Sequence, residues 1–176
     1  MRIISGTLGG RRFNPPAGFK ARPTTDYAKE SLFNVLQHLI DFEDCTVLDL
    51  FSGTGSISYE FASRGAAKIV AVEQHFSHCR FIKKMIEHFA IQNHQLIKAD
   101  VFRFIKTHKQ SYDIVFADPP YDADNISSLP DLVFDAALLN EEAVFVLEHS
   151  AKYNFNHHPH FSQSRNYGSV HFSFFV

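Results

Sequence analysis

Cysteine, long apolar runs and net charge are all scarce in this chain. Its two cysteines, Cys45 and Cys79, form no CxxC pair, so neither a disulfide framework nor a cysteine-rich metal site is indicated. No apolar run is long enough to span a bilayer, and the first residues lack the apolar stretch of a signal peptide. The formal net charge of −2 argues against a general polyanion binder. We therefore expect a reducing, cytoplasmic setting without membrane contact.

The rest of the composition is that of an ordinary globular protein. Apolar residues make up 45% of the 176 residues, and charged residues make up 20%. This length predicts a single domain, residues 1–176, with an N-terminal arm at 1–24 and the main core at 25–176. Eleven histidines are spread along the chain, and the polar stretch His157–His160 favours a solvated loop over a metal site. We therefore predict no metal centre.

Positive charge gathers at the N-terminus. Residues 1–30 contain six cations and two anions, a net charge of +4, which leaves the rest of the chain near −6. A basic arm on an acidic body suggests contact with a polyanion through that end of the molecule. Charge alone favours this interpretation no more than a solvated surface hairpin, so both remain open.

Short apolar strands alternate with amphipathic helices along most of the chain. Strands are predicted at 46–50, 68–72, 95–98, 112–117 and 143–148. Helices are predicted at 57–64, 75–90, 101–107 and 129–139. An earlier helix is capped by Thr24 or Thr25, a β-hairpin precedes it at 1–13, and an antiparallel pair closes the chain at 167–174. This order predicts an α/β, Rossmann-like, doubly wound and mostly parallel sheet that binds ligands at the carboxyl ends of its strands.

A glycine-rich turn follows the first predicted strand, in the sequence Asp49-Leu50-Phe51-Ser52-Gly53-Thr54-Gly55. Gly53 and Gly55 let the backbone turn sharply and approach a ligand closely, but Ser58 replaces the third glycine of the dinucleotide fingerprint. Asp49 would repel a pyrophosphate and attract a cationic or amine-bearing ligand. S-adenosylmethionine has a sulfonium and an α-amino group and no phosphate, so this turn favours that compound.

Two further acids follow predicted strands. Glu73 comes 20 residues after Gly53, the place from which an acid accepts both ribose hydroxyls of an adenosine group. The alternative for Glu73 is an acid in the first turn of the next helix, which its position makes less favoured. Asp100 is suited to accept from an adenine N6 amine while Val101 or Phe102 packs on the ring. An N-cap of the following helix explains Asp100 equally well.

The strand at 112–117 ends in Asp118-Pro119-Pro120-Tyr121. Two prolines cannot continue a central ladder because they lack the N–H, and they leave carbonyls free to accept hydrogen bonds. Asp118 and a proline carbonyl would hold the two N–H groups of an exocyclic base amine and expose its lone pair, while Tyr121 stacks on the base. Such a base must be flipped out of a duplex or already unpaired. A solvated turn that merely ends the strand is the alternative.

These motifs, together with others along nearly the whole chain, resemble those of the bacterial small-subunit ribosomal RNA guanine-N2 methyltransferases. The Asp-Pro-Pro-Tyr turn is shared with DNA adenine methyltransferases, whereas the Arg-Pro-Thr segment leading into Leu-Phe-Asn is far more specific to this family. The matching segments are Arg2-Ile3-Ile4-Ser5-Gly6, Gly10-Arg11-Arg12-Phe13, Arg22-Pro23-Thr24, Glu30-Ser31-Leu32-Phe33-Asn34-Val35-Leu36, Val47 to Gly55, Ser63-Arg64-Gly65-Ala66, Asp118 to Tyr121 and Tyr167-Gly168.

The resemblance implies a class I methyltransferase that moves a methyl group from S-adenosylmethionine to N2 of guanine 966 in 16S ribosomal RNA. Its substrate would be the small subunit or an assembly intermediate, of which ribosomal proteins can form a part. The implied cofactor contacts are Asp49, Phe51, Gly53, Gly55, Glu73, Asp100 and Val101. The implied catalytic residues are Asp118, Pro119, Pro120 and Tyr121, and the implied RNA contacts are Arg11, Arg12, Arg22 and Lys29. Gly9 and Tyr27 replace basic residues of the family, which predicts a weaker phosphate-binding surface.

Three other functions fit parts of the pattern. An adenine-N6 methyltransferase acting on DNA shares the turn at Asp118, but it usually needs a separate target-recognition region, for which 176 residues leave little room. A glutamine-amide methyltransferase would more often have Asn at that position. A non-catalytic RNA-binding or ribosome-assembly factor would have no reason to keep Asp49, Glu73 and Asp118 together.

Overall fold

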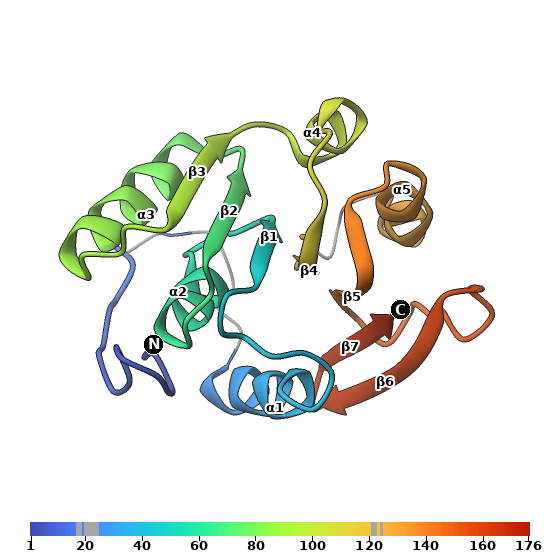
Figure 1. Ribbon diagram of the computed structural model, residues 1–176, viewed down its shortest axis with the longest axis horizontal. Coiled ribbons are helices and arrows are strands. Elements are labelled where there is room, and N and C mark those ends of the chain that lie inside the picture. The colour runs from blue at the N-terminus through green and yellow to red at the C-terminus, as the bar shows by residue number, and fades with distance from the viewer. Residues whose placement is uncertain (17–18, 20–24, 121–122, 124) are drawn as a thin grey trace.

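The fold is built on one sheet with helices on both faces (Figure 1). The structure is a computed structural model that describes residues 1–16, 19, 25–120, 123 and 125–176. Within them the sheet has seven strands in the order β3-β2-β1-β4-β5-β7-β6. The strands are β1 (Thr46–Leu50), β2 (Lys68–Glu73), β3 (His94–Lys98), β4 (Tyr112–Ala117), β5 (Leu139–His149), β6 (Phe161–Tyr167) and β7 (Val170–Phe175). The helices are α1 (Asp26–Leu36), α2 (Ser56–Ser63), α3 (Phe76–His88), α4 (Val101–Thr107), α5 (Leu129–Asp135) and the short 3-10 helix η1 (Ile126–Ser128).

The first five strands are parallel and the last two are antiparallel. β1 pairs with β2 and β4, β2 pairs with β3, and β4 pairs with β5 in parallel registers. β7 then pairs antiparallel with β5, and β6 pairs antiparallel with β7. The strand order reverses between β1 and β4, so a ligand crevice is expected at the carboxyl ends of those strands. The predicted doubly wound, mostly parallel sheet with a C-terminal antiparallel pair is confirmed.

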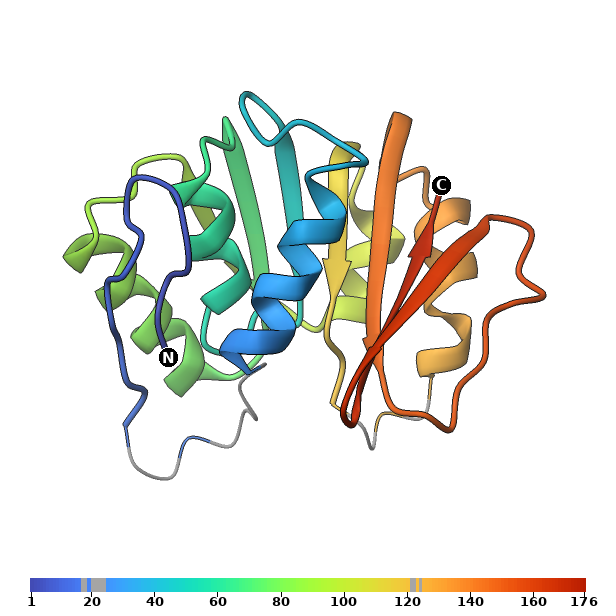
Figure 2. The same ribbon diagram turned by 90° about the horizontal axis from the view of Figure 1, so that it is seen from below.

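Side chains that alternate along the strands form two apolar layers. Val47 of β1 belongs to the cluster that packs against α1 and α2, whereas the next residue, Leu48, packs with α4 and α5. Figure 2 shows α1 and α2 on one side of the sheet and α4 and α5 on the other. Burial on both faces explains why the central parallel strands β1, β2 and β4 are nearly continuous apolar runs in the sequence. No helix in the described part of the chain is long and apolar enough to cross a membrane.

The first residues form the predicted hairpin, which packs on α2 and α3. The backbone N–H of Ile3 donates to the carbonyl of Arg11 at 2.9 Å, and Arg2 and Arg12 pair as an isolated antiparallel bridge. Ile3 and Phe13 are buried in an apolar cluster with side chains of α2 and α3. The basic N-terminus is therefore anchored to the core by its apolar residues.

Two predicted boundaries near β5 are wrong. The helix predicted at 129–139 is α5, which ends at Asp135 because Ala137, with a φ of 52°, lies in the left-handed region. The strand predicted at 143–148 begins earlier, at Leu139. Leu139 pairs with Tyr112 of β4 before the register shifts. The first residues of this strand are mostly polar, so a prediction based on apolar runs did not include them.

Candidate active site

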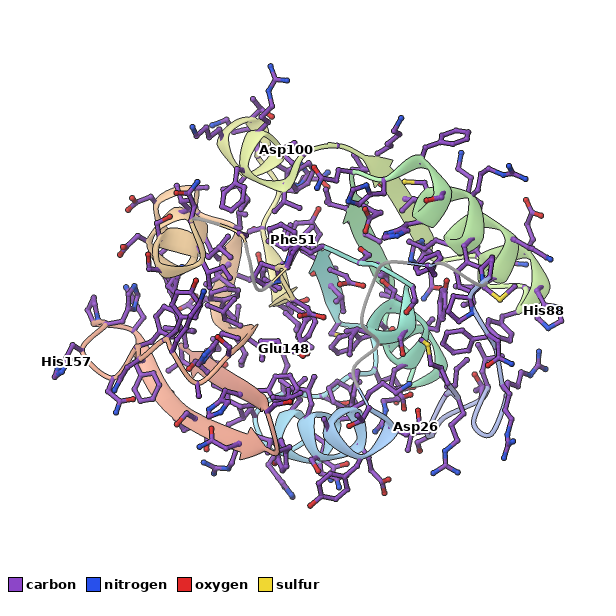
Figure 3. The ribbon with its side chains drawn as sticks, turned by 180° about the vertical axis from the view of Figure 1, so that it is seen from behind. Asp26, Phe51, His88, Asp100, Glu148 and His157 are labelled. Atoms are coloured by element: carbon purple, nitrogen blue, oxygen red, sulfur yellow. The ribbon has the colours of Figure 1, made fainter. Side chains whose placement is uncertain are left out.

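A cavity of about 800 Å³ opens at the carboxyl ends of β1, β2, β4 and β5. This volume is typical of sites for small organic ligands. The residues predicted from the sequence that line it are Asp49, Phe51, Gly53, Glu73, Val101 and Asp118–Pro120. In Figure 3, Phe51 and Glu148 lie near the centre of the molecule, whereas Asp100 lies farther out beside α4. Because the carboxyl ends of the parallel strands meet at one edge of the sheet, residues that are far apart in the sequence lie together there.

The turn after β1 lies directly against the end of β2. Gly53 has a φ of 53° and its backbone N–H donates to Oε2 of Glu73 at 2.9 Å. Gly55 has a φ of 78°, and a Cβ there would come 2.4 Å from the hydroxyl oxygen of Tyr59. Gly55 does not line the cavity. The space that Gly55 leaves open is therefore filled by α2, whereas Gly53 brings backbone to the cavity wall.

The carboxylate of Glu73 is fixed by two backbone donors. It accepts from the N–H of Gly53 and, through Oε1, from the N–H of His75 at 2.7 Å. The residue is only 5% exposed and lines the cavity. Since α3 begins at Phe76 and has no acid in its first turn, the alternative interpretation of Glu73 as a first-turn acid is wrong. A ligand in the cavity would meet an oriented acceptor at this point.

Asp49 is almost fully buried beside the glycine turn. Its Oδ2 accepts a hydrogen bond from the hydroxyl of Ser58 at 2.5 Å. Burial is the largest influence and raises the pKa of Asp49 to about 7, although the bond from Ser58 opposes this. Ser58, which replaces the third glycine of the dinucleotide fingerprint, therefore has a structural partner that the sequence did not reveal.

Asp118 lies directly after β4, at the wall of the cavity. Its backbone N–H donates to the carbonyl of Leu50 at 3.4 Å, which ties the turn to the end of β1. Burial raises the pKa of Asp118 well above its usual value, and the negative charges of Glu148 and Asp49 raise it further. A carboxyl group with a raised pKa is a stronger proton acceptor once it is ionised.

The two prolines after Asp118 differ in their surroundings. Pro119 is buried and Pro120 is exposed, although both line the cavity. The carbonyl of Pro120 accepts from the N–H of Ala123 at 2.9 Å, so the Pro119 carbonyl is the better candidate to accept from a ligand. Tyr121, predicted to stack on the base, lies outside the described residues.

Asp100 is the N-cap of α4. It is exposed and its Oδ1 accepts from the backbone N–H of Arg103 at 2.9 Å. The N-cap interpretation is therefore confirmed, and Asp100 is not among the residues that line the cavity. Val101, the next residue, does line the cavity and is 3% exposed. The contact of Asp100 with adenine stays a prediction.

Sequence reasoning missed one acid of the site, Glu148. It lies near the carboxyl end of β5, is 3% exposed and lines the cavity. Ala117 pairs with Leu147, so the parallel register places Glu148 beside Asp118. The rule that singled out Glu73 and Asp118, an acid at the end of an apolar strand, also applies to Glu148.

Comparison with known proteins agrees with this geometry. The family model described as "Conserved hypothetical protein 95" matches residues 1–176. The chain belongs to this family. YlbH of Bacillus subtilis is 32% identical over 153 residues, which cover 85% of this chain and 82% of that protein. Ribosomal RNA small subunit methyltransferase D of Escherichia coli strain K12 is 30% identical over 148 residues, which cover 84% of this chain and 74% of the relative.

Solved structures give the fold of the family. The structure of yhhF from Escherichia coli superposes with a TM-score of 0.86 at 26% sequence identity, covering 99% of this chain and 96% of that one. The predicted class I methyltransferase fold is thereby confirmed. In this family fold, the cavity described above lies where the strand order reverses.

The prediction that Lys29 faces RNA is wrong. Its side chain is fully buried, and its Nζ donates to the carbonyl of Arg2 at 2.5 Å and to the hydroxyl of Ser56 at 3.0 Å. Nζ also lies 3.7 Å from Oε2 of Glu60, whose own side chain is buried. Lys29 therefore ties α1, the N-terminal hairpin and α2 together.

Two of the other predicted RNA contacts, Arg11 and Arg12, lie in the N-terminal hairpin. Arg11 and Arg12 are exposed, in agreement with a surface role. Arg22 lies outside the described residues. Among the residues that the structure describes, no three His, Cys, Asp or Glu side chains are grouped so that they could hold a metal ion.

Proposed function

We propose that this protein transfers a methyl group from S-adenosylmethionine to the N2 amine of a guanine in small-subunit ribosomal RNA. The observation that carries the proposal is the position of Asp118–Pro120 at one wall of a cavity whose other walls are the glycine turn and Glu73. Support comes from the relative named ribosomal RNA small subunit methyltransferase D, which is 30% identical. The target nucleotide that the family resemblance implies is guanine 966 of 16S ribosomal RNA.

The acceptor groups on one side of the cavity suit the methyl donor. Glu73 presents a fixed carboxylate for ribose hydroxyls, and Gly53 brings backbone close to the ligand. A bound sulfonium or amine would favour the ionised form of Asp49, whereas a phosphate would be repelled by it. Phe51 and Val101 supply apolar surface for the adenine ring. The bound donor supplies a methyl group on a good leaving group.

The other side of the cavity suits an amine that must be made nucleophilic. Asp118 and the Pro119 carbonyl would accept the two N–H bonds of guanine N2 and orient its lone pair. As the new bond between carbon and nitrogen forms, the bond between carbon and sulfur breaks and N2 acquires a positive charge. N2 then loses one proton, to Asp118 or to water. Tyr121 would stack on the base and hold it in line.

The N-terminal hairpin is the proposed RNA surface. Arg11 and Arg12 are exposed there, and Arg22 follows along the chain. Apolar packing of Ile3 and Phe13 holds the hairpin in a defined position on α2 and α3. Basic side chains on a fixed element position RNA through its phosphates, while the cavity reads the base.

The test is methyl transfer from labelled S-adenosylmethionine to small subunits prepared from cells that lack this protein. We expect label on these subunits and none on duplex DNA or on subunits that the protein has already modified. Label on duplex DNA alone would contradict the RNA assignment and favour adenine-N6 methylation. Tight donor binding without label on any nucleic acid would favour the non-catalytic assembly factor.

A further inference from the structure

Glu148 stands beside Asp118 at the base-binding wall of the cavity. β4 and β5 are neighbouring parallel strands in which Ala117 pairs with Leu147. The residue after each member of this pair is an acid, Asp118 just beyond β4 and Glu148 within β5. Glu148 is 3% exposed and lines the same cavity as Asp118 and Pro119. In Figure 3 it lies at the centre of the molecule, inside the ring of helices. A carboxylate in this place can contact the same ligand as Asp118.

Both acids stand on the same face of the sheet. Phe116 and Val146, two residues before Asp118 and Glu148, belong to one apolar cluster, and side chains two apart in a strand share a face. On the far side of Glu148, Phe172 of β7 is its antiparallel partner and belongs to the same cluster. Glu148 therefore has Asp118 on one side and a buried aromatic residue on the other.

The adjacent carboxyl groups of Asp118 and Glu148 favour a ligand that donates hydrogen bonds to both. The charge of Glu148 is the largest cause, after burial, of the raised pKa of Asp118. A group that brings N–H donors to both acids relieves this repulsion. A carboxylate offers about four lone-pair sites, so Glu148 can accept from a ligand beside contacts that it already makes.

Among the bases, guanine brings a row of three adjacent donors, N1–H and the two N–H bonds of N2. Adenine brings two donors on N6, and its N1 beside them is an acceptor. We propose that Glu148 accepts the N1–H of the target guanine and thereby selects guanine over bases that carry an amine but lack this donor. The inference rests on the proposed function and names the residue that reads the base. Adenine would place a lone pair against the carboxylate, which is unfavourable.

The test compares guanine with 2-aminopurine, which keeps the amine at C2 but has an unprotonated N1. Small subunits are rebuilt in vitro with either base at the target position, and kcat/KM for methyl transfer is measured. We expect the wild-type protein to prefer guanine by about 10- to 100-fold. In Glu148→Gln the preference should shrink to about 3-fold or less, because the amide can donate to the bare N1. Glu141→Gln, an exposed acid of the same strand, should keep the wild-type preference.

The ratio of the two rates separates base reading from a structural role. A substitution that only damages the structure would lower both rates together and leave their ratio unchanged. Substitution of a residue that does not touch the base would also leave the ratio unchanged. An unchanged ratio in Glu148→Gln, with guanine still methylated by wild type, would overturn this inference and leave the proposed function standing. Equal rates on both bases in wild type would also overturn it. No methylation of guanine by wild type would overturn both proposals.

If Glu148→Gln does not fold, two other measurements decide the matter. The wild-type ratio needs no variant. Glu148→Asp keeps a carboxylate and should keep the preference for guanine while lowering kcat/KM for both bases. A wild-type kcat/KM for guanine in Glu148→Asp would contradict the proposed contact, because withdrawing the carboxylate by one methylene would then not affect the bound base.

Discussion

Asp118 and Glu73 line one cavity from the ends of two strands, β4 and β2, that are separated by β1. Asp118 has a raised pKa and lies beside Pro119 and Glu148, whereas Glu73 is fixed by the N–H groups of the glycine turn and His75. On this ground we propose that Asp118 binds the amine of the base and Glu73 binds the methyl donor. The two assignments can be tested independently because donor binding and methyl transfer are separate measurements.

We expect Asp118→Ala to lower the rate of methyl transfer by about 100- to 1,000-fold, because it removes the acceptor that orients the amine. Donor affinity, measured by calorimetry, should stay close to that of wild type. Glu73→Ala should instead weaken donor binding by about 10-fold or more, since it removes a charged acceptor. Asp135→Ala, an exposed acid, serves as the control. Equal loss of donor affinity in both site variants would contradict the assigned roles.

Asp49 makes stability depend on pH. Its pKa in the folded protein is about 7, above the usual value of 3.8, because burial disfavours the charged form. The folded state then holds the proton more tightly than the unfolded state, so this contribution to stability is full below about pH 4 and is lost as pH rises to about 7. In Asp49→Asn that loss should disappear.

The measurement is urea unfolding of both proteins at pH 5 and pH 8, without the donor. The free energy of unfolding of wild type relative to Asp49→Asn should be lower at pH 8 than at pH 5. The same difference at both pH values would show that Asp49 has no raised pKa.

At the residue scale, the sequence predicted which acids lie at the site better than it predicted their hydrogen-bond partners. Asp49, Glu73 and Asp118 were located because each lies at the end of an apolar strand, a rule that depends only on topology. The bond from Ser58 to Asp49 depends on how α2 packs on β1, which no local pattern contains. The sequence could not choose between the capping and ligand interpretations of Asp100; the structure confirms the cap, and the contact with adenine stays a prediction.

At the scale of the elements, Lys29 shows that a count of charges does not tell which cations are exposed. It lies three, four and seven residues before Leu32, Phe33 and Leu36, all of which are buried, so the helical spacing already placed it on the inner face of α1. The N-terminal charge count treated it as a surface cation. Its partner Glu60 also accepts from the N–H of Ile4 at 2.8 Å, so this ion pair is part of the anchor of the hairpin.

We expect Lys29→Met to lower the free energy of unfolding by about 3 kcal/mol, because it removes the cation from a buried pair. Glu60 would keep its ion pair with Arg64, at 2.9 Å, which limits the loss. Chemical denaturation measures the change, with Lys83→Met on the exposed face of α3 as the matched control. A loss no larger than that of the control would contradict the structural role of Lys29.

The order of elements followed from the sequence, but some boundaries did not. The predicted helix at 101–107 and strands at 46–50 and 112–117 are confirmed residue for residue, because glycine, proline or polar residues border their apolar patterns. β6 begins at Phe161, before the pair predicted at 167–174, since its exposed side chains alternate too weakly to be recognised as a strand. Strands at the edge of a sheet are stabilised by pairing with a distant neighbour, which periodicity cannot detect.

At the scale of the whole molecule, the N-terminal hairpin should position RNA for the cavity. Replacing both Arg11 and Arg12 by Ala should weaken binding to small-subunit RNA and reduce the slope of log affinity against log salt by up to about 2. Filter binding over a range of salt concentrations measures this. Replacing Lys106 and Lys109 by Ala is the control, since both are exposed at α4, away from the hairpin (Figure 1). An unchanged slope in the arginine variant would place the RNA surface elsewhere.

The central claim is that the cavity methylates N2 of guanine in ribosomal RNA. The most direct measurement is nucleoside analysis of small subunits from cells lacking the protein, after incubation with the purified protein and labelled S-adenosylmethionine. We predict that the label elutes as N2-methylguanosine and that Asp118→Ala yields almost none. Label in another nucleoside, such as N6-methyladenosine, would contradict the account, since the wall formed by Asp118 and Glu148 would then read a different base.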